Sequence, residues 1–120
     1  MASRLPHQLD LALTKRLREV VGGEPASESE LRGLADEADG WLRATDAHLH
    51  AAEARLTKLN ADPASPLAEI AAEVRRVEAL SQERQKARRL IDGLERRTRE
   101  LRTEWLKHRA DSGSPLQPNP

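Results

Sequence analysis

Apolar residues recur at intervals of three and four near the start of the chain. They fall on one face of a helix, and they are Leu9, Leu13, Leu17, Val20 and Val21. Pro6 suits the first turn of such a helix, where its missing N–H leaves no intrahelical hydrogen bond unmade. Gly22 and Gly23 follow, and glycine readily takes the left-handed conformation that ends many helices. The pattern predicts a helix over about residues 7–21.

A second apolar pattern repeats every seven residues and predicts a helix over about residues 28–60. Ser27 followed by Glu30 is a capping box, which satisfies two otherwise unpaired backbone N–H groups. Gly33 and Gly40 weaken the first half by about 1 kcal/mol each relative to alanine. Seven-residue spacing indicates a coiled-coil-like contact with another helix. The repeat forms two adjacent rows: Ala35, Leu42, Leu49 and Leu56, and beside them Leu31, Ala38, Thr45, Ala52 and Leu59.

The run ADPASP, within residues 60–66, holds two prolines that stop the second helix and start a third. The third helix is predicted over residues 66–109. Arg84 interrupts its heptads, and Gly93 is expected to be a weak point. Its apolar positions are Leu67, Ile70, Val74, Val77, Leu80, Ala87, Ile91, Leu94, Leu101 and Trp105.

The short connection makes the second and third helices antiparallel neighbours. Matching residues outward from the turn gives a register in which every pair is apolar: Leu59 with Leu67, Leu56 with Ile70, Ala52 with Val74, Leu49 with Val77, Ala38 with Ala87, Ala35 with Ile91, and Leu31 with Leu94. The sequence therefore predicts an all-α fold, a long antiparallel, coiled-coil-like helical hairpin with a short N-terminal third helix. One helical domain is expected over residues 6–109, between disordered segments at 1–5 and in the proline-rich tail 110–120.

The two arms of the predicted hairpin are unequal in length. Leu101 and Trp105 are expected to project past the second helix by about 15–20 Å at 1.5 Å per residue. The first helix could fold back across that end, or another chain could cover it. Trp41 lies one position off the apolar rows, where a third helix could cover it. Trp105 is the preferred partner contact, since exposed tryptophans are frequent hot spots. The predicted partner-binding residues are Leu9, Leu13, Leu17, Leu94, Leu101 and Trp105.

Composition fits this thin architecture and narrows the chemistry. In 120 residues, 33% are charged and the aromatic residues are two tryptophans, so a deep globular core is not expected. Cysteine is absent, which excludes disulfides, thiolate nucleophiles and Cys-ligated zinc. Residues 1–10 have no continuous apolar stretch typical of a signal peptide, and no segment is long and apolar enough to span a bilayer. An intracellular, cytoplasmic protein without membrane contact is expected.

Candidate ligands for a metal occur once. Asp46, His50 and Glu53 share a helix face beside His48, and two such faces could bind zinc in a dimer. A solvated polar face explains the same residues more simply. No glycine-rich phosphate loop or nucleophile constellation is present. The sequence therefore predicts no catalytic residues, no metal, no cofactor and no small-molecule substrate.

The C-terminal half of the third helix is rich in basic residues. Residues 84–109 hold ten Lys or Arg and four Asp or Glu, whereas residues 27–62 hold eight acidic and four basic residues. Mutual compensation across the hairpin is favoured. A nucleic-acid surface is the alternative, since such residues neutralise phosphates. The candidate basic surface is Arg88, Arg89, Arg96, Arg97, Arg99 and Arg102.

Residues 34–56, LADEADGWLRATDAHLHAAEARL, resemble the first helix of a spectrin-type repeat in their Trp-Leu pair and heptad spacing. The resemblance covers about a quarter of the chain and implies helices in a bundle. It does not extend to the segment 87–108, where the break before a third repeat helix is missing. In outline the hairpin is also similar to secretion-stalk and ESX-type families, although the turn ADPASP lacks the Trp-x-Gly of the latter.

These features predict a non-enzymatic helical protein–protein interaction module, acting as an adaptor, scaffold or assembly subunit. Its partner would be another protein or a second copy in a homo-oligomer, because burial of the projecting apolar end favours association. Two alternatives stay open: a nucleic-acid-associated protein that uses the basic surface, and a secretion or assembly chaperone whose groove receives a partner helix.

Overall fold

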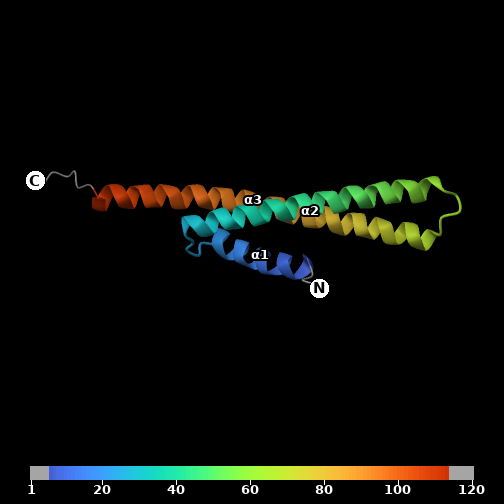
Figure 1. Cartoon of the computed structure of the whole chain (residues 1–120), viewed down its shortest axis with the longest axis horizontal. Helices are drawn as coiled ribbons and strands as arrows, with labels where there is room; N and C mark the ends of the chain where they lie inside the picture. The colour runs from blue at the N-terminus through green and yellow to red at the C-terminus, as the bar shows by residue number, and fades with distance from the viewer. Residues whose placement is uncertain (1–5, 114–120) are drawn as a thin grey trace, which may run out of the picture.

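Three α-helices make up the fold in the computed structural model, which describes residues 6–113 and the side chains of residues 11–111. α1 spans Pro6–Val21, α2 spans Glu28–Ala61 and α3 spans Leu67–Gly113. α2 and α3 form a long antiparallel hairpin, and α1 lies along its half distant from the tip (Figure 1). The predicted all-α hairpin with a short N-terminal helix is confirmed. No helix in the described part has a segment that could cross a membrane.

The helix boundaries agree with the sequence within a few residues, except at the C-terminus. α3 continues through residues 110–113, which the sequence assigned to a disordered tail. The predicted disordered segment 1–5 and the rest of the tail, 114–120, lie outside the described residues.

The corner between α1 and α2 is held by a glycine cap. Gly23 has φ of 116°, in the left-handed region that glycine adopts without steric cost. Its N–H donates to the carbonyl of Val20 at 3.1 Å, and the N–H of Glu24 donates to the carbonyl of Glu19 at 2.9 Å. These two bonds form a Schellman motif and satisfy carbonyls at the end of α1. Arg97 of α3 donates from Nη2 to the Gly23 carbonyl at 3.2 Å, which ties the corner to α3.

Only half of the predicted capping box forms at the start of α2. The Ser27 hydroxyl accepts a hydrogen bond from the N–H of Glu30 at 3.0 Å, as predicted. The Glu30 carboxylate does not complete the box, because both of its oxygens accept hydrogen bonds from Arg16 of α1. A stronger, charged partner from another helix has thus replaced the local one.

The tip of the hairpin is a tight polar turn. Asp62 caps α2, and its Oδ1 accepts a hydrogen bond from the N–H of Ala64 at 2.9 Å. The N–H of Ser65 donates to the Asp62 carbonyl at 3.0 Å. Asp is common at such positions because its carboxylate mimics a backbone carbonyl. The turn sends α3 back along α2, and three cross-helix contacts lie within about one helical turn of the predicted register: Trp41–Glu83, Asp46–Arg84 and Arg55–Glu73.

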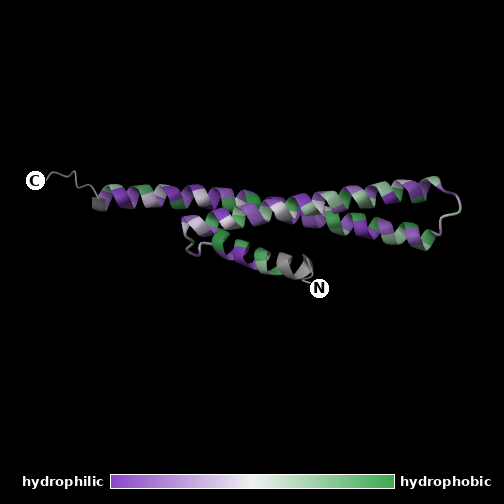
Figure 2. Ribbon diagram, viewed as in Figure 1, coloured by the Kyte–Doolittle hydropathy of each residue, from purple (hydrophilic) through white to green (hydrophobic). Residues whose placement is uncertain are grey.

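The core lies in the half of the hairpin that α1 covers. Leu17 and Val20 of α1 are fully buried there, as are Ala38 of α2 and Ala87 of α3. A third helix supplies apolar cover that a pair of helices cannot give itself. This three-helix base is completed by Leu31, Leu34, Trp41, Leu94 and Leu101. Green apolar positions and purple polar positions alternate along all three ribbons, as expected of helices that each bury one face (Figure 2).

The tip half has only two helices, and several predicted contacts are less covered there. Leu67 is 83% exposed and Val74 is 37% exposed, so the pairing of Leu59 with Leu67 produces no buried pair. Leu67 begins α3, where no further turn and no third helix can cover it. Leu49 and Ala52 are buried because they lie between the two helices. Ala35 of the base is also exposed, on the side of the hairpin away from α1.

Gly93 has a different role from the weak point that the sequence predicted. It is buried, and a Cβ at this position would lie 3.0 Å from Val21 Cγ1 and 3.3 Å from Cγ2. A side chain here would push α1 away from α3. Gly33 and Gly40 differ, because a Cβ at either would meet no neighbour within 4 Å. The absence of a side chain at Gly93 therefore permits the close approach of α1.

Alanine substitutions at Gly93 and Gly40 are expected to change stability in opposite directions. Gly40→Ala should raise the free energy of unfolding by about 1 kcal/mol, because alanine has the higher helix propensity. Gly93→Ala should lower it by roughly 1 kcal/mol, because the strain of an overpacked contact exceeds that gain. Urea denaturation followed by circular dichroism measures both. Equal stabilisation by the two substitutions would contradict the packing of Val21 against Gly93.

Candidate interaction surface

The six predicted partner-binding residues do not form one open surface. Leu17, Leu94 and Leu101 are at most 6% exposed and belong to the three-helix base. Leu13 and Trp105 are half-buried against the same core. The side chain of Leu9 lies outside the described residues. The chain itself therefore covers most of the apolar surface that the sequence offered to a partner, and that role for these residues stays a prediction.

The projecting end of α3 begins later than predicted. Leu101 is buried rather than projecting, because it belongs to the core cluster against which Ala26, just before α2, also packs. The next residue, Arg102, pairs with Glu28 at the start of α2, with 3.1 Å between Arg102 Nη2 and Glu28 Oε2. Trp105 is half-buried at this point, and Leu106 is 65% exposed. α3 continues past the start of α2 (Figure 1). The apolar part of the overhang is thus reduced to Trp105 and Leu106.

Trp41 serves the interior of the base. Its side chain is 5% exposed and lies in the core cluster with Leu17 and Leu34. The indole Nε1–H donates to Glu83 Oε2 of α3 at 3.0 Å. A buried indole N–H needs such an acceptor, since an unpaired one costs free energy. Trp41 therefore fastens α2 to α3 and is not available to a partner.

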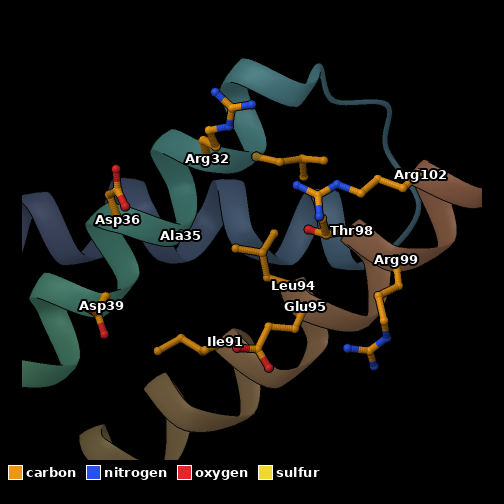
Figure 3. Close-up of a pocket in the computed structure, with 11 residues that line it drawn as sticks. Arg32, Ala35, Asp36, Asp39, Ile91, Leu94, Glu95, Thr98, Arg99 and Arg102 are labelled. Carbon is orange, nitrogen blue, oxygen red and sulfur yellow. The ribbon is translucent and has the colours of Figure 1, made fainter. Parts of the chain in front are cut away.

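A groove remains open between α2 and α3 in the base (Figure 3). Its volume is about 490 Å³, and we call it the basal groove. Leu31, Ala35, Ile91 and Leu94 form an apolar floor, of which Ala35 and Ile91 are accessible. The remaining lining residues are polar: Arg32, Asp36, Asp39, Glu95, Thr98, Arg99 and Arg102.

The basal groove lies on the opposite side of the hairpin from α1. Gly93 faces Val21 of α1, and Arg97 binds the turn after α1. Glu95 and Arg99, each two residues further along α3, line the groove. Two residues along a helix correspond to a rotation of about 200°, so the two sets face opposite ways. α1 therefore leaves the groove uncovered.

The two rims of the basal groove carry mainly opposite charges. Asp36 and Asp39 extend from α2, while Arg99 and Arg102 extend from α3 (Figure 3). Further toward the tip, an acidic residue of α2 and a basic residue of α3 form an ion pair, with 3.1 Å between Asp46 Oδ1 and Arg84 Nε. An acidic rim facing a basic rim over an apolar floor suits an amphipathic helix with charges of both signs on its flanks.

Arg16 connects α1, the corner and α2. Its Nη2 donates to Glu30 Oε1 at 2.7 Å and to the carbonyl of Pro25 at 3.2 Å, and its Nε donates to Glu30 Oε2. Nη1 lies 3.2 Å from Glu19 and 3.5 Å from Glu24. Hydrogen bonding to Arg16 lowers the pKa of Glu30, and hydrogen bonding to Glu30 raises the pKa of Arg16. The guanidinium thus holds α1 at the start of α2 by a bidentate carboxylate pair.

The candidate zinc residues are not brought together as a set. Asp46 is paired with Arg84, while His48, His50 and Glu53 are exposed on α2. Among the side chains that the structure describes, no three of the metal-binding types are grouped to hold an ion. Nothing in this arrangement adds to the metal hypothesis.

The six predicted basic residues differ in what they contact. Arg88, Arg89, Arg96 and Arg99 are exposed along α3. The other two are engaged within the chain: Arg97 with the Gly23 carbonyl and Glu100, and Arg102 with Glu28. The charge compensation between α2 and α3 that the sequence predicted is therefore formed by two ion pairs at opposite ends of the base, Arg84 with Asp46 and Arg102 with Glu28.

No protein family model, curated protein or solved structure matches this chain. The resemblance of residues 34–56 to a spectrin-type repeat thus gains no further support.

The pair between Arg16 and Glu30 predicts a pH dependence of stability. The pKa of Glu30 is lower in the folded chain than its usual value of about 4.3. The pair with Arg16 therefore contributes fully to the free energy of unfolding above that pH. The contribution is lost as the pH falls through the lowered pKa. Glu30→Gln should therefore lower the melting temperature at neutral pH, and its difference from the unmodified chain should vanish in strong acid.

Glu37→Gln is the matched control for this experiment, since Glu37 is an exposed glutamate on the same helix. It should change the melting temperature little at either pH. A Glu30→Gln variant that melts like the unmodified chain at neutral pH would show that the pair with Arg16 does not hold α1 in place.

Proposed function

We propose that this chain is a non-enzymatic protein–protein interaction module that receives a partner helix in the basal groove. The observation that carries the proposal is the groove itself, an apolar floor between rims of opposite charge on the side that α1 leaves open. A helix docked there would bury Ala35 and Ile91 and complete a four-helix arrangement. Adaptor, scaffold and assembly-subunit roles all follow from such docking.

Binding through the groove also agrees with how the rest of the surface is used. The larger apolar side chains of the base are already buried between the three helices. The groove is therefore a shallow site whose specificity would come from its charged rims, while its floor supplies a modest apolar contribution. Such a site suits reversible association rather than a permanent complex.

The nucleic-acid alternative has weaker support. Arg88, Arg89, Arg96 and Arg99 are exposed, but Asp92 and Glu100 lie on the same stretch of α3 and are also exposed. Acidic groups among the basic ones weaken attraction to a phosphate backbone. The nucleic-acid function therefore stays a prediction, which nuclease treatment and the salt dependence of capture would test.

A pair of glutamate substitutions tests the proposed docking site. Ala35→Glu places a charge on the groove floor and should abolish capture of the protein partner. Ala44→Glu is the matched control, because Ala44 is an exposed alanine nine residues along α2 and so on its opposite face. Quantitative mass spectrometry of affinity-captured complexes measures the difference, after thermal melts have shown that both variants are folded.

Three outcomes decide between the candidate functions. Partners lost with Ala35→Glu and retained with Ala44→Glu support the module. Equal capture by both variants contradicts docking in the basal groove. Capture that nuclease treatment abolishes, together with steep salt dependence, would favour the nucleic-acid function instead.

A further inference from the structure

The charge distribution over α2 and α3 restricts how a partner can lie on the basal groove. Residues 27–62 hold eight acidic and four basic residues, and residues 84–109 hold ten basic and four acidic ones. A partner must therefore place positive charge over α2 and negative charge over the base of α3. The chain itself carries both kinds of helix, in the spacing that the groove requires.

Two copies of a hairpin can stack face to face about a two-fold axis in two ways. In the first, the axis runs perpendicular to the helices and parallel to the plane of the hairpin, so the two tips point in opposite directions. This arrangement places α2 over α2 of the partner and α3 over α3, which sets like charges against each other. An axis along the hairpin places α2 over α3 of the partner and aligns the two tips. Only the second arrangement sets opposite charges together, and it repeats the pairing of α2 with α3 that already exists within one chain.

The side chains at one level of the groove fit the second arrangement. Arg32 and Glu95 both line the groove, and this axis would place Arg32 opposite the partner's Glu95. One heptad toward the tip, Asp39 would lie opposite the partner's Arg88. Both Asp39 and Arg88 are exposed in the single chain, where Asp39 also pairs with Arg43 one turn along α2, with 3.2 Å between Asp39 Oδ2 and Arg43 Nη1. At these two levels the charges on α2 and on the partner's α3 are therefore opposite in sign.

The same arrangement would cover apolar surface in the tip half. Arg76 and Ala79 of α3 line a hollow with Leu11 and Thr14 on the α1 side of the hairpin. Val74 and Val77 each precede one of them by two residues, a rotation of about 200°, and Ile70 lies seven residues before Val77. These three residues therefore lie toward the groove side of α3. Val74 is 37% exposed, and Ile70 and Val77 are half-buried. Two aligned tips would close these residues into a four-helix section where one chain has only two helices.

We infer that the occupant of the basal groove is a second copy of this chain, packed in parallel with α2 of each copy over α3 of the other. The inference rests on the proposed function, because it identifies the partner of the same groove. α1 lies on the outer side of both copies, so it does not obstruct the contact.

Distance measurement between the two tips tests the arrangement directly. The chain has no cysteine, so Ala64→Cys places a single spin label in the exposed tip turn. Parallel packing should give an interlabel distance within about 30 Å, since packed helices lie roughly 10 Å apart. Antiparallel packing over the 34 residues of α2 would separate the tips by about 50 Å. Pulsed electron paramagnetic resonance distinguishes the two.

A charge exchange tests the same arrangement without a label. Asp39→Arg and Arg88→Asp should each weaken dimerisation in sedimentation equilibrium by about tenfold, because the two-fold axis repeats the opposed pair and each variant sets like charges together at both places. The double variant should recover most of the loss, because the exchanged side chains of the two copies again face each other with opposite charge. Circular dichroism melts of each variant show whether the single chain stays folded. Failure of the double variant to recover the dimer would overturn the inference.

The remaining outcomes separate this inference from the proposed function. A long interlabel distance, or a monomer at micromolar concentration, would overturn the parallel dimer. If Ala35→Glu then still removes a different captured protein that Ala44→Glu retains, the groove is a docking site for another chain and the proposed function stands. If neither variant changes capture and the chain is monomeric, both proposals fail.

Discussion

Close packing of α1 on the hairpin is the interaction on which the rest of the structure depends. Val21 lies against Gly93, and this contact lets Leu17 and Val20 become fully buried between α2 and α3. A two-helix hairpin cannot bury residues of this size on both faces. The packing of one short helix therefore divides the hairpin into a three-helix base, which holds the main core, and a two-helix tip in which fewer residues are buried.

The same contact determines which surface is left for association. α1 covers one face of the base and leaves the basal groove open on the other. It also withdraws Leu17, Leu94 and Leu101 from the set of residues that a partner can reach. What remains is a shallow apolar floor with charged rims, so in the function that we propose the charge pattern, rather than the apolar area, would decide which partner and which orientation fit.

Local signals in the sequence predicted the elements and their order well. The proline-rich turn, the heptad rows and the glycines after Val21 act over a few residues, and they predicted three helices and the pairing of α2 with α3. The site was harder to predict, because it depends on where α1 lies. A side chain as distant in sequence as Arg16 decides the orientation of Glu30. The sequence predicted a weak point at Gly93, because it does not show that Val21 of α1 packs against this residue. Heptad spacing identifies apolar positions, but it does not show which of them a third helix will cover.

Hydrogen exchange along the chain tests most directly whether α1 creates the stable base. Amide protection rises with the free energy needed to open a segment. Our account predicts strong protection in the second half of α1 and in the base segments 31–45 and 87–101, with weaker protection in the tip segments 52–61 and 67–77. Equal protection of base and tip, or an α1 that exchanges as fast as an unfolded peptide, would contradict it.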